Sequence, residues 1–139
     1  MSEDDLAALC ARAMRRLSEA ELPLLHEHGL SMWQYVALTA LARAPAHSQL
    51  ELAQAIRYDK TRLIGLLDEL ETAGLVARER DPGDRRARLV SLTAAGAERH
   101  AAAQRAIRAM ETERLASLTP AERALLRSAL ATLAGAVAP

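Results

Sequence analysis

The chain lacks several residue types that other protein classes depend on. Among its 139 residues there is no Phe, one Trp, two Tyr and one Cys. A single cysteine excludes an internal disulfide, and no apolar run approaches the roughly 18–20 residues that a membrane-spanning helix needs. Half of the chain is apolar, mainly Leu and Ala, which favours helices packed through small and straight-chain residues. We expect a mainly helical, cytoplasmic protein.

The chain also lacks a net charge, with 18 basic and 18 acidic residues. No global basic field therefore points to a nucleic-acid partner. Lys60 is the only lysine, so arginine carries nearly all of the positive charge, and its guanidinium suits bidentate contacts to phosphate or guanine. Any such interpretation depends on where the arginines gather.

The two ends of the chain predict long amphipathic helices. Residues 3–22 carry an apolar stripe, and Pro23 is expected to kink or interrupt this helix late, before Gly29 ends it. An alanine-rich helix runs from Thr93 to about residue 117, and a last helix, opened by a capping box at Thr119, has a leucine stripe that reaches Val137. Because these faces exceed what a chain of this size covers, we expect a second copy to pair with them.

Between the flanks, three helix starts lie close together. Ser31 and Ser48 each begin a capping box, and the helix that the first one opens ends before Pro45. Asp59 caps a third helix after a connection of two residues. Helices joined so tightly must turn sharply, as in a helix-turn-helix.

The third helix has the pattern of a recognition helix. Its leucines and Ile64 are expected to face the core, and Gly65 leaves room for close approach of a partner. The residues expected to contact DNA on this helix are Asp59, Lys60, Thr61, Arg62 and Gly65.

The charge order along this helix is unfavourable for its stability. Lys60 and Arg62 lie at its positive end and Asp68, Glu69 and Glu71 near its negative end, each arrangement costing roughly 0.3–1 kcal/mol. One interpretation is that the basic end meets a polyanion while the acidic end is held away from it. The alternative is an ordinary set of solvated charges.

A strand, a tight turn and a second strand follow Gly74. Pro82 and Gly83 predict a type II turn between strands at residues 75–80 and 86–92. Arginines at the tip of a hairpin can enter a minor groove, or they can form a solvated edge that resists aggregation. The hairpin arginines are Arg78, Arg80, Arg85, Arg86 and Arg88.

Six short segments from Gly29 to Gly96 appear in a characteristic order. They are WQYVALTALAR, ELA, DKTRL, LETAGLVAR, DRRARLV and SLTAAG, beginning at Trp33, Glu51, Asp59, Leu70, Asp84 and Ser91. In this order they resemble the MarR family of bacterial transcription regulators. The flanking helices extend the resemblance over nearly the whole chain.

The resemblance implies one mainly α (α+β) domain over residues 1–139. Residues 31–93 would form a winged helix-turn-helix with a small β-hairpin wing that binds DNA, and residues 1–30 and 94–139 the helical dimerisation part. The implied function is a sequence-specific, ligand-responsive repressor, a homodimer on a near-palindromic operator in double-stranded DNA. The family's wing motif D-x-R falls on Asp84 and Arg86, making Arg86 the minor-groove arginine and Asp84 its orienting partner. The wing residues expected at DNA are Arg80, Asp84, Arg85, Arg86 and Arg88.

Family members often respond to small phenolic or other apolar ligands, or to oxidants. A candidate effector pocket includes Met14, His26, Met32 and Trp33, although core packing is the stronger interpretation of Met14, Met32 and Trp33.

Two other residue groups invite a sensing role. Cys10 resembles the reactive cysteine of peroxide-sensing relatives, but it lies roughly one helical turn too close to Pro23 and the assisting tyrosines are missing, so a buried structural thiol is preferred. His26 and His28 are interpreted as solvent-facing or capping groups rather than metal ligands.

The sequence offers little for chemistry. It has no nucleophile–base pair, phosphate loop or metal cluster, so we expect neither a cofactor nor enzyme activity. The alternative function is a winged-helix module that binds another protein and no DNA, which net neutrality alone supports.

Overall fold

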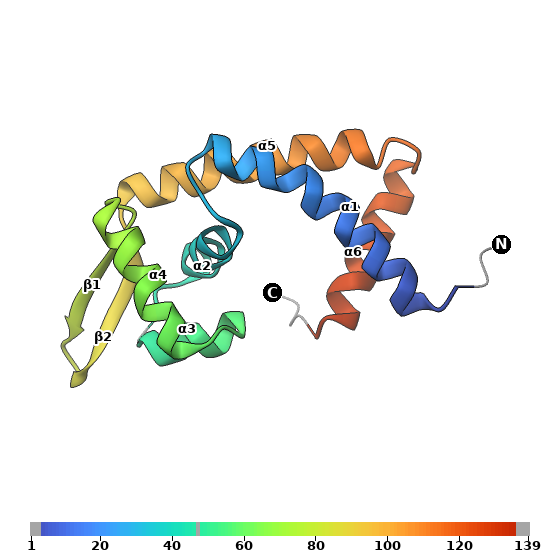
Figure 1. Ribbon diagram of the computed structural model, residues 1–139. Helices are drawn as coiled ribbons and strands as arrows, with labels where there is room; N and C mark the ends of the chain where they lie inside the picture. Colours follow the sequence, from blue (N-terminus) through green and yellow to red (C-terminus); the bar gives the residue numbers. More distant parts are fainter. Residues whose placement is uncertain (1–3, 47, 136–139) are drawn as a thin grey trace.

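The computed structural model describes residues 4–46 and 48–135, with only the backbone of Asp84 and Arg85. In Figure 1, α2, α3, α4 and the hairpin form one half of the molecule, and α1, α5 and α6 extend into the other. Within the described residues the elements are α1 (Leu6–Glu27), α2 (Met32–Arg43), α3 (Gln49–Ile56), α4 (Lys60–Thr72), β1 (Val76–Asp81), β2 (Asp84–Leu92), α5 (Ala94–Arg114) and α6 (Pro120–Leu133).

Helix α1 continues through Pro23, so the predicted interruption is wrong. Proline removes one backbone hydrogen bond, but the turn that follows is anchored by Leu25, which is completely buried. The predicted cap is confirmed: Gly29 has a φ of 70°, and the Leu30 amide donates to the Leu25 carbonyl at 2.9 Å. Packing of the last turn therefore outweighs the missing bond.

The three predicted helix starts in the centre are confirmed. Ser31 and Gln34 form a complete capping box, and Asp59 accepts from the Arg62 amide at 2.8 Å. At Ser48 only half of the predicted box forms: its side chain accepts from the Glu51 amide. Between α3 and α4, Arg57 has a φ of 54°. This left-handed residue lets the chain reverse within the short connection.

The wing is a two-stranded antiparallel hairpin that a third segment supports. Ala46 exchanges two backbone hydrogen bonds with Val90 of β2, at 2.9 and 2.8 Å, so the chain before α3 is tied to the wing. The type II turn is wrong, because Gly83 lacks the positive φ that this turn requires. Instead, the Asp81 carboxylate accepts a hydrogen bond from the Gly83 amide at 2.9 Å.

Helix α5 begins where predicted and ends about one turn early. Thr93 caps it through the Gly96 amide, and the helix stops at Arg114, three residues before the expected end. Gly96 lies against the chain at the start of the wing: a Cβ there would come within 1.9 Å of the Leu75 carbonyl oxygen. This close approach sets the distance between α5 and the wing.

The core joins α2, α3 and α4 to the wing and to α5. Ile64 is 47% exposed, so its predicted burial is wrong. It lies about 100° around the helix from Leu63, off the stripe that faces the core. The buried residues of α4 are Leu63, Leu66, Leu67 and Leu70.

Much of the apolar surface of α1 and α6 is exposed. Core packing is wrong for Met14, which is 66% exposed, and for Trp33, which is 40% exposed, whereas Met32 does pack against the core. Cys10 is also exposed, which contradicts a buried thiol. Cys10 and Met14 are exposed because none of the described residues covers this side of α1. The exposed leucines on the two helices include Leu6, Leu9, Leu125, Leu126, Leu130 and Leu133.

Two residues from the sequence analysis, His47 and Val137, lie outside the described residues. Across the described residues, every helix is too short or too polar to cross a membrane.

Candidate nucleic-acid interface

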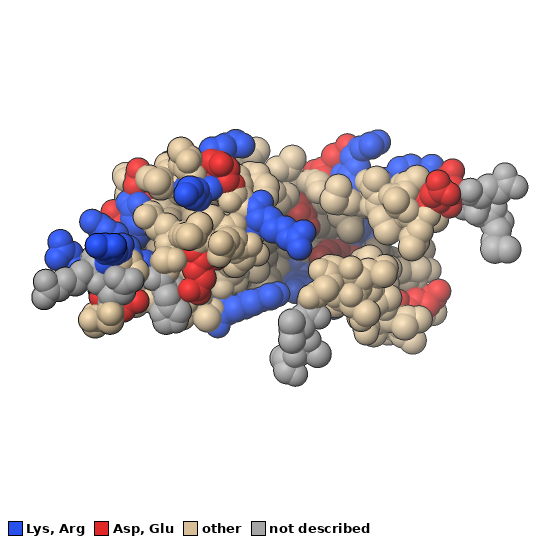
Figure 2. Space-filling model, turned by 90° about the horizontal axis from the view of Figure 1, so that it is seen from below, with Lys and Arg blue, Asp and Glu red and all other residues tan. Residues whose placement is uncertain are grey.

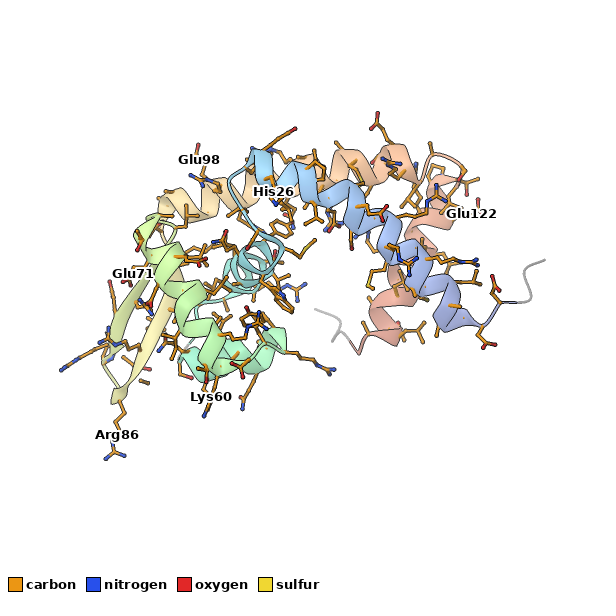
Figure 3. All side chains as sticks on the ribbon, viewed as in Figure 1. His26, Lys60, Glu71, Arg86, Glu98 and Glu122 are labelled. Atoms are coloured by element: carbon orange, nitrogen blue, oxygen red, sulfur yellow. The ribbon has the colours of Figure 1, made fainter. Side chains whose placement is uncertain are left out.

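The N-terminal end of α4 is basic and open. Lys60, Thr61 and Arg62 are exposed. The Asp59 carboxylate caps the helix by accepting a hydrogen bond from the Arg62 amide. In Figure 3, Lys60 and Arg86 both point to the lower side of the molecule, the first from α4 and the second from the tip of the wing. The predicted helix and wing contacts therefore share one side.

Arg62 is held by an aromatic pair that the sequence did not reveal. Its guanidinium carbon lies 5.3 Å from the centre of the Tyr58 ring, within the range of a cation–π contact. The Tyr58 ring in turn packs against Trp33, with 4.5 Å between the ring centres. Trp33, at the start of α2, thus supports an arginine of the recognition helix instead of filling the core.

Arg78 forms a clamp between the wing and the two helices behind it. Its side chain is only 13% exposed and donates to the carboxylates of Asp68 and Glu71, the latter at 3.1 Å. It also donates to Gln49 of α3 at 3.2 Å. Hydrogen bonding to Arg78 lowers the pKa of Glu71 from its ordinary value, and the same bond raises the pKa of Arg78.

This clamp accounts for the acidic end of α4. Asp68 and Glu71 bind an arginine of their own chain, and Glu69 accepts from the Gln34 side chain at 3.1 Å. Arg78 therefore offsets part of the negative charge at this end of the helix, and each of the three acids has a hydrogen-bond donor within the chain. Arg78, grouped with the other hairpin arginines from the sequence, points inward, and its long-range partners had no local sequence signal.

Two exposed arginines of the wing face each other and destabilise the hairpin. Arg80 and Arg88 lie directly opposite each other in the strand register and both are exposed. Like charges opposite each other destabilise a strand pair. Such a pair gains from an anionic partner, which supports the polyanion interpretation of the wing.

The tip of the wing carries Arg86, which is exposed. The side chains of Asp84 and Arg85 lie outside the described residues, so the pairing of Asp84 with Arg86 stays a prediction. Figure 2 views this side from below and shows Lys and Arg spread along the end formed by the wing and α4, with separate acidic groups among them. Although the chain has no net charge, basic side chains gather at this end of the molecule.

Two cavities lie away from the candidate effector residues. A cavity of about 600 Å³ lies between the end of α1 and the start of α5, lined by residues such as His28 and Arg99. A second, of about 350 Å³, lies between α5 and α6. Neither is lined by the predicted residues Met14, His26, Met32 or Trp33.

The histidines at the end of α1 take the roles expected for them. Nδ1 of His28 lies 2.8 Å from the Leu24 carbonyl oxygen and donates to it, which confirms a capping role, and His26 is exposed. Within the part of the chain that the structure describes, no three His, Cys, Asp or Glu side chains are grouped as a metal site would require.

Comparison with known proteins identifies relatives of the central part of the chain. A family model described as MarR family matches residues 28–87. The regulator PrsX of Escherichia coli is 34% identical over 93 residues, 66% of this chain and 56% of that protein. The uncharacterized regulator YdgJ of Bacillus subtilis is 34% identical over 105 residues, 76% of this chain and 64% of that protein. The chain thus spans less than two thirds of either curated relative.

Solved structures match over nearly their full length. The transcriptional repressor CouR, bound to a 23-mer DNA duplex, is 31% identical with a TM-score of 0.83, covering 94% of this chain and 92% of that one. A MarR family protein of Mycobacterium tuberculosis in complex with DNA is 27% identical with a TM-score of 0.80, covering 94% and 98%. The winged helix-turn-helix, its flanking helices and these matches show that the chain belongs to the MarR family of transcriptional regulators.

Proposed function

We propose that this protein is a sequence-specific DNA-binding regulator that represses transcription. One observation carries the proposal: the exposed Lys60 of α4, at the basic turn that also holds exposed Arg62, lies on the same side as Arg86 of the wing, while Arg78 binds the nearby Asp68 and Glu71. The similar structures of CouR and of the Mycobacterium tuberculosis protein each contain DNA. In this proposal α4 enters the major groove and the wing reaches the adjacent minor groove.

The proposed active form is a homodimer on a near-palindromic operator. The exposed leucines of α1 and α6 support this, because apolar side chains left open in one chain are best covered by the equivalent residues of a second copy. Two-fold symmetry then presents two winged helices to half-sites about one helical turn apart.

The proposed signal is a small phenolic or other apolar ligand that releases the DNA. A structure of CouR from Rhodococcus jostii RHA1, 26% identical with a TM-score of 0.80, is bound to p-coumaroyl-CoA and covers 98% of this chain and 96% of that one. That likeness supports a ligand-responsive repressor here without identifying its ligand. The proposal places the protein in the cytoplasm, and it includes no cofactor and no enzyme activity.

Titration with a DNA fragment from upstream of the protein's own gene tests the DNA-binding part. Lys60→Ala and Arg86→Ala should each weaken binding, and each should reduce the salt slope of log K by about one, because each removes one charge from the contact. Arg105→Ala is the matched control, since it removes an exposed arginine from α5, outside the winged helix.

Unchanged affinity and salt slope in both variants would show that this surface does not bind DNA. A complete absence of binding by the wild-type protein would favour the protein-binding winged helix instead.

A further inference from the structure

The middle of the recognition helix presents apolar chemistry to its partner. Between the basic N-terminal turn and the acids held by Arg78, the five residues from Leu63 to Leu67 have no polar side chain. Of these, Ile64 is 47% exposed. A Cβ on Gly65 would meet no described atom within 4 Å, so the chain itself leaves this part of the helix open.

The charged groups on either side of Ile64 have other roles. The Asp68 carboxylate accepts from Arg78. Lys60 and Arg62, the latter stacked on the Tyr58 ring, form the basic first turn that the proposed function places against DNA. The apolar groups that the middle of the helix offers to a base are the Ile64 side chain and the methyl of Thr61, which lies one turn before Ile64.

We propose that Ile64, together with the methyl group of Thr61, reads the C5-methyl group of a thymine in the major groove. Thymine alone among the four bases presents a methyl group there, and apolar side chains recognise it by contact. The absence of a side chain at Gly65 lets the helix approach closely enough for this contact. The inference rests on the proposed DNA-binding function and names the base chemistry that the same site selects.

The contact predicts a specific response to thymine without its methyl group. Replacing thymine with deoxyuridine keeps every hydrogen-bonding group of the base and removes only the methyl. Burial of one methyl contributes about fourfold in affinity. Wild-type protein should therefore lose about fourfold at one thymine in each half-site and little at the others.

The experiment uses duplexes that the full-length wild-type protein selects from a random-sequence library. Each thymine is replaced in turn by deoxyuridine, and dissociation constants are measured for wild type, Ile64→Ala and Thr61→Ser. Ile64→Ala should bind the thymine and deoxyuridine duplexes with nearly equal affinity, and Thr61→Ser should show a reduced ratio. Leu50→Ala is the matched control: Leu50 is 51% exposed but lies on α3, and its variant should keep the wild-type ratio.

Circular dichroism verifies that the variants fold. We expect Ile64→Ala to fold because Ile64 is partly exposed. Equal binding of wild type to all thymine and deoxyuridine duplexes would overturn the inference, as would an unchanged ratio in Ile64→Ala. In either case, the proposed function would still hold if the protein binds DNA and if Arg86→Ala reduces the salt slope of log K. Selection of no duplex at all would overturn both.

Discussion

Gly65 and Gly96 are both helical glycines, and their surroundings give them opposite roles. No described atom lies within 4 Å of a Cβ built on Gly65, whereas a Cβ on Gly96 would overlap the Leu75 carbonyl. Glycine inside a helix costs roughly 0.5–1 kcal/mol relative to alanine. Gly96 is explained by packing, whereas packing within the chain does not explain Gly65, to which we assign the proposed approach of DNA.

Gly65→Ala should therefore separate stability from binding. We expect the free energy of unfolding to rise by roughly 0.5–1 kcal/mol, because alanine favours the helix and has free space. DNA affinity should fall, because the added methyl group meets the groove. Urea denaturation and a DNA titration measure the two effects. Gly96→Ala is the contrast, with a stability loss of roughly 1–3 kcal/mol from overpacking; equal or tighter DNA binding by Gly65→Ala would contradict the role given to Gly65.

We expect Arg78 to affect DNA binding through the acids of α4 that it binds. Arg78→Ala leaves the carboxylates of Asp68 and Glu71 unneutralised beside the groove, so we expect weaker DNA binding and a higher pKa for Glu71. Adding Asp68→Asn and Glu71→Gln to Arg78→Ala should restore much of the affinity, because the repulsion is removed. Fluorescence anisotropy with labelled duplex measures both variants. Failure of the triple variant to recover would indicate that Arg78 serves the wing's geometry instead.

At the scale of elements, a buried histidine joins α2 to α5. Nε2 of His100 lies 3.0 Å from the Thr39 hydroxyl. Because that hydroxyl donates to the Tyr35 carbonyl at 2.8 Å, the histidine nitrogen must carry a proton and donate. The ring also stacks on Tyr35, with 5.3 Å between centres. Burial lowers the pKa of His100 from its ordinary value of 6.5.

This junction should weaken on acidification. The unfolded chain takes up a proton at His100 at a higher pH than the folded protein does, so stability from the neutral histidine is complete above about pH 6.5 and is lost as the pH falls through the lowered pKa. His100→Gln should reduce the difference in free energy of unfolding between neutral and mildly acidic buffer. Denaturant titrations across that range measure it. His26→Gln removes an exposed histidine and should keep the wild-type difference in free energy of unfolding. If His100→Gln also kept that difference, His100 would not be the group that weakens the junction at low pH.

Helix caps could be predicted from the sequence, whereas the continuity of α1 and the tip of the wing could not. The capping residues Ser31, Asp59 and Thr119 were identified from the sequence because a cap joins residues three apart. The uninterrupted α1 was missed, because the packing that tolerates Pro23 comes from elsewhere in the chain. The tip of the wing was missed because the Asp81 side chain replaces the expected backbone turn.

At the scale of the whole molecule, the exposed leucines on α6 lead to a prediction about assembly. Leu130→Glu combined with Leu133→Glu should convert the proposed dimer into a folded monomer, since both side chains are already exposed in the single chain. DNA affinity should fall by about a hundredfold or more, because one half-site no longer supports the other. Light scattering and DNA titration measure the two results.

Ser128→Glu is the control for negative charge on α6, because it adds one glutamate away from the stripe of Leu126, Leu130 and Leu133, and it should stay dimeric. A double leucine variant that stays dimeric would exclude this face from the interface.

The sequence by itself determined the order of the elements, the helix starts and the family pattern, because these depend on residues close together in the chain. Only the tertiary structure decided that Arg78 clamps α4, that Trp33 supports Tyr58 beneath Arg62, and that Ile64 is open while Leu63 is buried. These outcomes depend on which surfaces of distant segments meet. Such contacts decide which of the charged and apolar residues remain free for a partner.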